Sequence, residues 1–439
     1  MEATRLGHQV TLFEATRVAG GRARRVNGHL NGKAVPLDNG QHILIGAYTE
    51  TLKLMGALGI DASSVLRRIP LTLLFPDGDG LRFRALASPF DALHAIATAR
   101  GWNWRERISL LGQAWRWRRA RFECAASASV ADLCAGLSDT VMATLIEPLC
   151  VSALNTPASR ASGKVFLRVL QDALFQRSGG SNLLLPRVDL SALLPQTALA
   201  WLTAHGGQLR LGERVQALTR IEGGWVVGTN GRPIDTGGDA PREPVDDRPS
   251  FDRVVLACPV TESLRLVRGS GVAANEWEAR AGALTHEALT TVYAFAPGPR
   301  GPTGATLGQP MLTLRSDASH PAQFVFDRGQ LGGPAGLLAF VISASEGDGA
   351  ALTQQVRAQA SAQLGLQVQP VQTIVEKRAT FSCTPGLQRP STYVAPALLA
   401  CGDYIAGPYP ATLEGAVRSG LRAARDLPLN NPRPPPSRY

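Results

Sequence analysis

The sequence has few of the features that define several common protein classes. Its six cysteines are scattered without a CxxC pair, so neither a zinc site nor a disulfide scaffold is indicated. No stretch offers about 18 uninterrupted apolar residues, and no apolar signal core follows the N-terminus, so we expect no spanning helix. Reduced thiols are the simplest account of the cysteines, which predicts a cytoplasmic protein without a metal site.

Lysine is also scarce, although the chain is basic. The net charge is +10, and the only lysines are Lys33, Lys53, Lys164 and Lys377, so arginine carries nearly all the positive charge. A positive balance favours anionic partners such as nucleic acid, phosphates or an anionic membrane face. No nucleic-acid-binding motif is present, so we expect no nucleic-acid partner. With 439 residues, 44% of them hydrophobic, the chain can bury a large core, and its length suggests two domains or three.

The first residues are typical of the second half of a dinucleotide-binding βαβ unit. Residues 2–6 indicate the end of a helix, Gly7 its stop, and residues 8–14 a short strand that ends in Glu14. The first half of such a unit, a strand and a Gly-rich phosphate turn, should lie upstream. A start codon placed too far downstream is the explanation we favour over a truncated gene. On either explanation we expect the chain to bind its cofactor poorly or not at all.

Periodicity and turn residues predict a coarse order of elements along the chain. The stretch 229–250 is rich in Gly, Pro and Asp and predicts a long exposed loop. Helical patterns cover residues 49–58, most of 88–176, 190–205, 353–364 and 412–421, and strand patterns cover 208–211, 215–221, 254–257, 290–295 and 336–342.

The first motif with a chemical meaning is Glu14 followed by Gly20-Gly21-Arg22. An acid at the end of a strand can accept hydrogen bonds from both ribose hydroxyls of an adenosine. The glycines let backbone N–H groups approach a pyrophosphate, and Arg22 can add a charge-assisted contact. A solvated strand end before a flexible turn is the alternative, and the spacing favours a nucleotide site.

Two further motifs follow. The run Asp38-Asn39-Gly40-Gln41-His42 could let backbone lie against a flat ring at its glycine, or could form an ordinary Asn-Gly turn. Gly402-Asp403 ends an expected strand, and Thr412-Leu413-Glu414-Gly415-Ala416 opens an expected helix. A strand-end Asp can bind sugar-like hydroxyls, and a helix N-terminus can stabilise developing negative charge. A capped helix after a loop is the alternative.

The order of these motifs, together with Val254-Val255-Leu256-Ala257, resembles that of the flavin amine oxidase and phytoene desaturase superfamily. Within it, the chain resembles the squalene-associated FAD-dependent enzymes, the hydroxysqualene dehydroxylases of hopanoid gene clusters. The runs that carry this likeness are residues 38–48, 148–156 and 402–420. The resemblance covers essentially the whole chain. It implies an α/β, amine-oxidase-like fold: a Rossmann-like FAD-binding domain, here without its first strand, and a mixed α+β substrate domain.

The resemblance also implies domain boundaries. A discontinuous FAD-binding domain would comprise residues 1–60, 188–260 and 395–426. A substrate domain that faces the membrane would comprise residues 61–187 and 261–394. Residues 427–439 would form a disordered tail.

Individual residues acquire roles around FAD from the same resemblance. Glu14 would hold the adenosine ribose, and Val215 would meet the adenine through its backbone. The other contacts would come from Gly20, Gly21 and Arg22 at the pyrophosphate, Gly40 and Gln41 near the flavin ring, Gly402 and Asp403 at the ribityl–pyrophosphate stretch, and Leu413 at the pyrimidine side of the flavin.

The reaction that the resemblance implies is reductive. Hydroxysqualene, an isoprenoid lipid, would lose its hydroxyl and become squalene, with hydride supplied by the reduced flavin. An acid should assist departure of the hydroxyl. His42 is a candidate, although a histidine beside a glutamine in a turn is more often structural.

Four of the seven tryptophans lie between Trp102 and Arg121, interleaved with arginines. Trp and Arg together suit a lipid headgroup interface, which predicts peripheral contact with the inner face of the membrane. An amphipathic helix with its tryptophans packed inward is the equal alternative. Two other functions also stay open. One is a desaturase or amine oxidase that runs in the oxidising direction, and the other is a truncated, non-catalytic scaffold for squalene-pathway enzymes.

Overall fold

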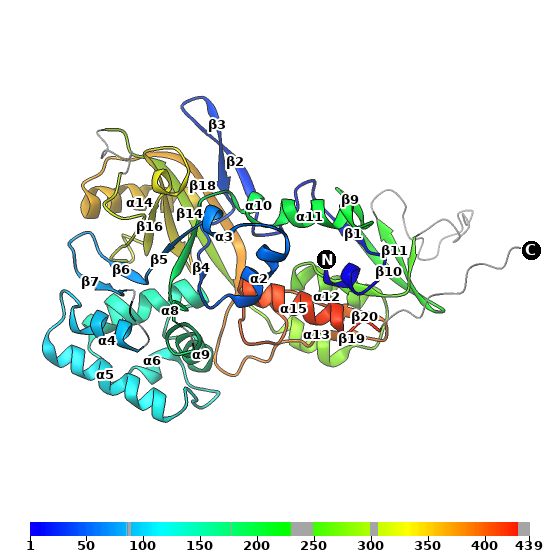
Figure 1. Ribbon diagram of the computed structural model, residues 1–439, viewed down its shortest axis with the longest axis horizontal. Coiled ribbons are helices and arrows are strands. Elements are labelled where there is room, and N and C mark those ends of the chain that lie inside the picture. The colour runs from blue at the N-terminus through cyan, green and yellow to red at the C-terminus, as the bar shows by residue number, and fades with distance from the viewer. Residues whose placement is uncertain (85, 87–88, 177, 230–248, 299–305, 429–439) are drawn as a thin grey trace, which may run out of the picture.

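The elements of the protein gather in two groups along its long axis (Figure 1). The computed structural model describes residues 1–84, 86, 89–176, 178–229, 249–298 and 306–428. Most of the expected loop 229–250 and of the expected tail therefore lies outside the described residues. One group holds the strands that carry the nucleotide motifs, and the other holds a large antiparallel sheet with helices beside it.

The parallel strands beside the nucleotide motifs form two separate pairs. Strand β1 (Thr11–Glu14) pairs with β9 (Gln208–Leu211), and β13 (Val254–Leu256) pairs with β20 (Leu398–Ala400). Strand β19 (Tyr393–Ala395) joins β20 on its other side, antiparallel. Among the described strands, β1 and β13 therefore each keep one edge without a hydrogen-bonded partner.

Short helices and a small antiparallel sheet surround these pairs. The sheet consists of β10 (Val215–Ile221), β11 (Gly224–Thr229) and β12 (Ser250–Phe251). The helical pattern at 190–205 is two helices rather than one, α10 (Leu190–Leu193) and α11 (Pro195–Ala204). The break falls at Pro195 because proline lacks the N–H that would continue the first helix. The other helices here are α1 (Glu2–Arg5), α2 (Thr49–Ala57), α3 (Ala62–Val65), α12 (Val260–Gly269), α13 (Asn275–Gly282) and α15 (Leu413–Arg425).

A five-stranded antiparallel sheet forms the centre of the second group. Its strand order is β15-β16-β17-β14-β18. All seven residues of β17 are buried, because helix α14 (Gly349–Leu364) and its neighbours cover one face and the main core covers the other. The strands are β14 (His286–Phe295), β15 (Met311–Thr313), β16 (Phe324–Asp327), β17 (Leu337–Ser343) and β18 (Gln369–Phe381).

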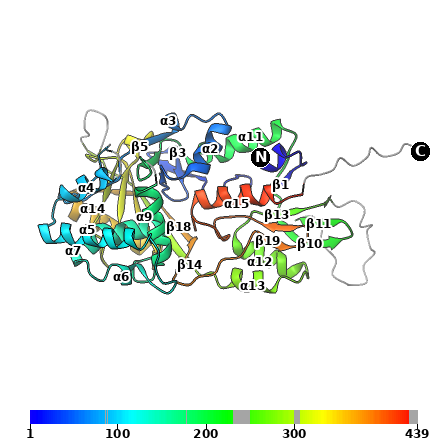
Figure 2. The same ribbon diagram turned by 60° about the horizontal axis from the view of Figure 1, so that its bottom comes forward.

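Residues 89–176 are mostly helical, as the sequence predicts. Figures 1 and 2 show these helices gathered at one end of the molecule, beside the five-stranded sheet. A π-helical turn (Met142–Ile146) leads into α8. The helices are α4 (Phe90–Ala97), α5 (Trp104–Arg119), α6 (Val130–Leu133), α7 (Asp139–Val141), α8 (Glu147–Leu154) and α9 (Gly163–Leu174). No helix within the described residues combines the length and apolar character needed to cross a bilayer.

Three further small sheets complete the fold. Strand β8 (Leu183–Pro186) pairs with both β4 (Leu44–Ile45) and β5 (Leu66–Ile69), and so ties residues on both sides of the expected boundary at residue 60. The hairpin β2 (Arg25–Leu30) and β3 (Lys33–Asp38) leads into the Asp38–His42 run. A second hairpin consists of β6 (Thr72–Leu74) and β7 (Gly80–Arg82).

Candidate functional site

The first and last nucleotide motifs of the chain touch each other. Arg22 follows β1 and Asp403 follows β20, and Arg22 Nη2 lies 2.7 Å from Asp403 Oδ2. The other guanidinium nitrogen, Nη1, donates to the carbonyl oxygen of Ala379 in β18. Because the Arg22 side chain keeps 34% of its exposure, the guanidinium is fixed in place but still open to solvent. A ligand that follows one motif therefore also reaches the other.

The turn before Arg22 needs its first glycine and leaves space at its second. Gly20 has φ +120°, and a Cβ there would lie 2.5 Å from the Ala23 carbonyl oxygen. Gly21 has φ +58° and is exposed, and a Cβ there would have no neighbour within 4 Å. The backbone at Gly21 is thus open to a bound group, as the pyrophosphate prediction requires.

The Asp38–His42 run lies against the same place. Asn39 Nδ2 donates to Glu376 Oε2 at 3.0 Å and to the Arg22 carbonyl oxygen at 3.3 Å. Gln41 Oε1 accepts from the buried Arg328 at 3.3 Å. Gly40, buried with φ +156°, would bring a Cβ no closer than 3.5 Å to a neighbour. The middle motif therefore packs beside Arg22, and it leaves room at its glycine.

His42 is held in one tautomer. Its Nδ1 lies 2.8 Å from the Gly40 carbonyl oxygen, and because a carbonyl only accepts, Nδ1 carries the proton. Burial lowers the pKa of His42, and the charge of Arg22 lowers it further. The neutral ring then offers the Nε2 lone pair as an acceptor. This geometry suits a hydrogen-bond acceptor better than an acid, so the catalytic role of His42 stays a prediction.

Asp38 is a buried carboxyl with an unsatisfied oxygen. Its Oδ1 accepts from the backbone N–H of Leu190 at 2.8 Å. Its Oδ2 has no hydrogen-bond partner among the described residues, and the nearest cation, Arg328, lies 3.9 Å away. Burial is the main cause that raises the pKa of Asp38 to about 6. The sequence singled out the run but assigned this residue no role, because burial at a turn is not visible in a single sequence.

His286 is a second residue that the sequence did not single out. It begins β14 and is partly buried. Burial lowers its pKa, as do the charges of Arg378 and Arg22, while Asp403 acts in the opposite direction. A histidine thus lies within the field of the Arg22–Asp403 pair, and no local pattern in the sequence marks it.

The N-terminus of helix α15 belongs to the same cluster. The Asp403 carbonyl oxygen accepts from the N–H of Ala411 at 3.2 Å. Thr412 caps the helix, because its Oγ1 accepts from the N–H of Gly415 at 3.0 Å. The N–H groups of Leu413 and Glu414 precede the helical hydrogen-bond ladder and give this end a partial positive charge. Leu413 itself packs partly buried against a small apolar cluster.

The buried carboxylate of Glu414 locks this helix against α2. It is fully buried and accepts from the backbone N–H groups of Glu50 at 3.0 Å and Thr51 at 2.9 Å. The Thr51 hydroxyl and Arg418 Nε complete its partners at 2.8 Å and 2.7 Å. Two helix N-termini therefore meet on one carboxylate, which sets the position of the α15 end relative to the Asp38–His42 run and the residues after it.

Glu14 and Val215 also lie near each other. The Glu14 carbonyl oxygen accepts from the N–H of Glu213 at 3.0 Å, two residues before Val215. The Glu14 carboxylate accepts from the N–H and hydroxyl of Thr16 at 2.8 Å and 3.0 Å. The Val215 carbonyl oxygen accepts from Arg265 at 3.0 Å. The structure brings the two predicted adenosine residues together, while their contacts with a nucleotide stay predictions.

A cavity of about 700 Å³ opens next to the Asp403–Thr412 loop. This volume is within the usual range of small-molecule sites, roughly 300–1,000 Å³. Its walls are mixed: apolar side chains such as Phe122 and Phe381 alternate with basic ones, and Glu123 is the acid among them. Its basic side chains are Arg121, Lys164, Arg168 and Arg389.

One wall of this cavity has an unusual backbone. Arg121 and Phe122 have φ of +54° and +59°, a left-handed conformation that non-glycine residues seldom adopt. The Phe122 ring packs on Phe175 with 4.9 Å between centroids. Across the cavity, the Arg389 guanidinium donates to the carbonyl oxygens of Ile405 and Gly407. The cavity is thus fixed to the loop that carries Asp403.

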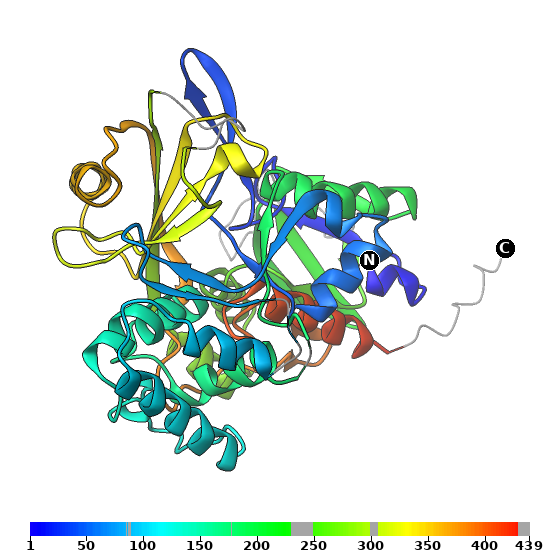
Figure 3. The ribbon, with the colours of Figure 1, turned by 60° about the vertical axis from the view of Figure 1, so that its left-hand side comes forward.

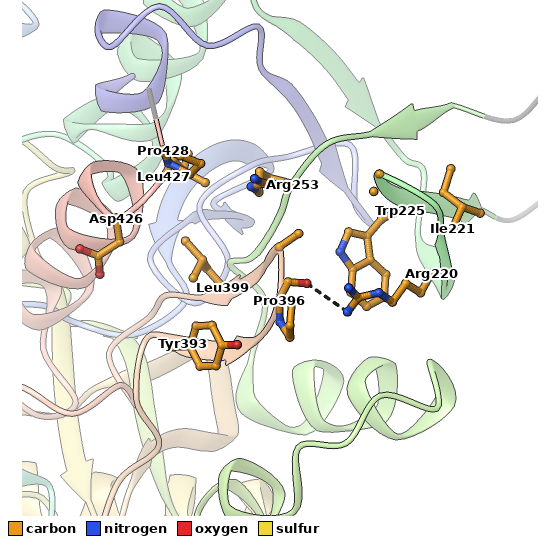
Figure 4. Close-up of a pocket in the computed structure, with 13 residues that line it drawn as sticks. Arg220, Ile221, Trp225, Arg253, Tyr393, Pro396, Leu399, Asp426, Leu427 and Pro428 are labelled. Atoms are coloured by element: carbon orange, nitrogen blue, oxygen red, sulfur yellow. Dashed lines mark hydrogen bonds between the residues drawn. The ribbon is translucent and has the colours of Figure 1, made fainter. Parts of the chain in front are cut away.

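A second pocket, of about 340 Å³, lies elsewhere (Figure 4). It is lined by Trp225, Leu399 and residues after α15, and Arg220 donates to the Pro396 carbonyl oxygen at 3.5 Å on its rim. Arg253 and Ala397 place it at the amino ends of β13 and β20. Ligands of parallel sheets bind outside the carboxyl ends of strands, where Glu14 and Asp403 lie. We therefore assign the candidate site to the Arg22–Asp403 cluster.

The residues present fit an elongated nucleotide cofactor. The chain supplies a partly buried strand-end acid, Glu14, open glycine backbone beside the half-exposed Arg22, and the N-terminus of α15. These groups suit hydroxyls, phosphates and a developing anion in turn. The cavity near Asp403 then offers space for a second molecule.

Several known proteins are similar to this chain along almost its whole length. A hydroxysqualene dehydroxylase of Rhodopseudomonas palustris is 27% identical over 97% of this chain and 94% of its own length. Another, from Sinorhizobium fredii, is 25% identical over 98% and 95%. An oxidoreductase from Methanosarcina mazei has the same fold, with a TM-score of 0.64 at 16% identity over 97% of both chains. The model of the family "Flavin containing amine oxidoreductase" matches residues 4–428. The chain therefore belongs to the family of flavin-containing amine oxidoreductases.

Proposed function

We propose that the protein is an FAD-dependent oxidoreductase that removes the hydroxyl of hydroxysqualene reductively to give squalene. In this reaction the carbon–oxygen bond breaks, a proton leaves with the hydroxyl as water, and a hydride takes its place on carbon. When bound, the reduced flavin supplies that hydride. The observation that carries the proposal is the contact between Arg22 and Asp403, which joins the two nucleotide motifs beside a mixed apolar and basic cavity.

The residues of the cluster have separable tasks in this proposal. Glu14 and Val215 hold the adenosine, the Gly20–Arg22 turn holds the pyrophosphate, and Asp403 holds the ribityl stretch. The N-terminus of α15 at Leu413 stabilises negative charge at the pyrimidine side of the flavin. Gly40 and Gln41 form the backbone surface beside the ring. The similarity to two hydroxysqualene dehydroxylases along almost the whole chain supports this reading.

The charge of the cavity argues against an amine substrate. Amines are cations at neutral pH, and the cavity carries four basic side chains against the single acid Glu123. Of these cations, Arg168 is paired with the buried Asp172 at 2.7 Å. A neutral hydrocarbon chain meets Phe122, Phe381 and the prolines of the Asp403–Thr412 loop instead. We therefore propose a lipid rather than an amine as the substrate of this family member.

The reaction is tested directly with hydroxysqualene. The protein is saturated with FAD, reduced anaerobically with dithionite and mixed with hydroxysqualene in detergent, and the lipids are separated by gas chromatography and mass spectrometry. We expect squalene in an amount equal to the flavin that is oxidised. Oxidised isoprenoid products from a parallel incubation with oxidised FAD in air would indicate the desaturase direction. If the protein neither binds flavin nor turns over the substrate, the result would indicate the non-catalytic scaffold.

A matched pair of variants tests the cofactor site. Arg22→Ala should weaken FAD binding about tenfold or more, because it removes a charge-assisted contact. Arg25→Ala removes an exposed arginine three residues away on β2 and should leave the Kd unchanged. Flavin titration followed by fluorescence measures both. Equal Kd values for the two variants would contradict the site.

A further inference from the structure

Helix α5 has two opposite stripes, and the outward stripe is the more apolar. The buried stripe of the helix consists of Glu106, Leu110, Gln113 and Trp117, at helical spacing. The residues two positions earlier point away from them by about 200° and stay exposed, because successive residues turn by about 100°. They are Trp104 at 64% exposure, Ile108 at 59%, Leu111 at 36% and Trp115 at 60%.

The inner stripe holds the helix in place through polar contacts. Glu106 accepts from the N–H of Asn103 at 2.8 Å and from the Ser138 hydroxyl at 3.2 Å. Gln113 Nε2 donates to the Leu133 carbonyl oxygen at 2.7 Å. Packing inside the protein therefore does not need the outward stripe. A soluble surface helix normally shows the reverse order, with its apolar stripe inside.

Helix α4 extends the apolar surface. Phe90 is 64% exposed and Leu93 is 44% exposed, one turn apart. Arg107 of α5 donates to the Ala99 carbonyl oxygen at 2.8 Å, which joins the two helices near the end of α4. Figure 1 and Figure 3 both place α4 beside α5 at the same corner of the molecule. Half of the twelve exposed large apolar side chains among the described residues lie on these two helices.

Positive charge flanks this surface. Arg105 stacks over the Trp104 ring at 5.3 Å and Arg119 over the Trp115 ring at 5.5 Å. The only acid of α5, Glu106, is buried. None of the exposed arginines of α5 forms an ion pair with a described residue. The exposed arginines of the helix are Arg105, Arg116, Arg118 and Arg119.

We propose that the outward face of α5, with the exposed residues of α4, docks on an anionic phospholipid bilayer. In this arrangement α5 lies in the plane of the interface, with its tryptophans at the headgroup boundary and its unpaired arginines on lipid phosphates. The charge decides the occupant. A second copy of this basic face would repel the first, whereas anionic lipid matches it.

The surface leads to the cavity. Helix α5 ends at Arg119, and the residues that follow, from Arg121 to Ala126, form part of the cavity wall. A bilayer at α5 would therefore lie next to the cavity entrance on that side. We infer that a lipid substrate enters from the bilayer here, and this step alone rests on the proposed function.

Vesicle binding tests the docking without any substrate. The protein should float with vesicles of phosphatidylcholine and phosphatidylglycerol, and salt should weaken the binding. Trp104→Ala with Trp115→Ala should reduce the partition constant about tenfold or more. Arg116→Ala with Arg118→Ala and Arg119→Ala should reduce it about a hundredfold on anionic vesicles, with little change on pure phosphatidylcholine. The control Ile221→Ser, on an exposed residue of β10, should bind as the parent does.

Quenching of tryptophan emission by brominated lipid tests whether these rings contact the bilayer, and it does not depend on a measured partition constant. Emission from the parent should fall on brominated anionic vesicles, and the double tryptophan variant should lose this quenching, because Trp102 and Trp117 are buried. No flotation, or a stable dimer in sedimentation that the tryptophan variant abolishes, would overturn the proposal. If docking holds, the double variant should raise KM for vesicle-embedded hydroxysqualene and leave turnover in detergent unchanged. If docking on vesicles is confirmed but the double variant leaves this KM unchanged, only the proposed substrate is contradicted, and the docking proposal stands.

Discussion

Arginines serve opposite purposes in two regions of this molecule. Arg22 is held by Asp403 and by a carbonyl of β18, so its guanidinium has a defined position. The exposed arginines of α5 have no ion-pair partner among the described residues, so they contribute charge to a surface and fix no geometry. The first arrangement suits one phosphate in one place, and the second suits many headgroups in no fixed place. The way an arginine is partnered therefore indicates which kind of anion it meets.

The same contrast extends to stability. Around Arg22, polar groups from distant parts of the chain are buried on one another, so removal of one partner leaves another unsatisfied. On the α5 face, large apolar groups are exposed and support nothing beneath them. We therefore expect the costs of substitution to fall steeply from the first region to the second, and each of the following predictions can break or sharpen that order.

The largest effect is expected at Glu414. Glu414→Ala removes the acceptor for the N–H groups of Glu50 and Thr51 and leaves Arg418 without its ion-pair partner, which should cost about 4 kcal/mol of unfolding free energy. Urea denaturation measures this cost. Glu276→Ala, at an exposed helical pair with Arg280, is the control and should change the free energy by less than about 0.5 kcal/mol.

Asp38 should make stability depend on pH. Its folded pKa of about 6 lies above the ordinary value of 3.8, so the folded protein holds the proton more tightly. The resulting stability is fully present below about pH 4 and is lost as the pH rises through 6. Asp38→Asn stays neutral at every pH. Its unfolding free energy relative to that of the parent should therefore rise by about 3 kcal/mol from pH 4 to pH 7. If the difference in unfolding free energy between Asp38→Asn and the parent were the same at pH 4 and pH 7, the raised pKa of the buried carboxyl would be contradicted.

Gly415 tests how closely α15 approaches the loop before it. A Cβ at this position would clash with the Tyr409 carbonyl oxygen, so Gly415→Ala should cost about 2 kcal/mol. Gly420→Ala in the same helix meets nothing within 4 Å and should be neutral or stabilising by about 0.5 kcal/mol. Thermal unfolding of the two variants distinguishes local crowding from helix propensity, and equal shifts would refute the close approach.

The Arg22–Asp403 pair should show a modest coupling. Because both side chains are only partly shielded, a double-mutant cycle of Arg22→Ala and Asp403→Ala should give about 1 kcal/mol of interaction energy. Denaturation without flavin gives the structural part of this coupling. A value near zero would mean that the pair is not formed in solution.

The smallest effect should come from the largest side chains. Trp104→Ala with Trp115→Ala should change the unfolding free energy by less than about 0.5 kcal/mol, since both rings are mostly exposed. Trp117→Ala removes a buried ring of the same helix and should cost about 3 kcal/mol. If the exposed pair cost as much as the buried ring, the outward stripe would be part of the core.

Much of the local structure could be predicted from sequence patterns. Strands β9 and β10 begin and end where the apolar runs do, and α15 begins just after its capping threonine. The long strand β18 was not predicted, because its sequence carries Glu376, Lys377 and Arg378 without a period of two. Pairing with β14 decides that strand, and such pairing is a property of distant residues.

The sequence by itself determined which chemical groups the protein has and in what order: a strand-end acid, open glycines, an arginine, a second strand-end acid and a capped helix. These features depend on neighbours within a few residues, where backbone sterics and capping act. The tertiary structure alone decided that Arg22 meets Asp403 across the length of the chain, that Asp38 is buried, and that the tryptophans of α5 divide between inside and outside. Those outcomes depend on which surfaces distant parts of the chain cover, and a local sequence pattern does not contain this information.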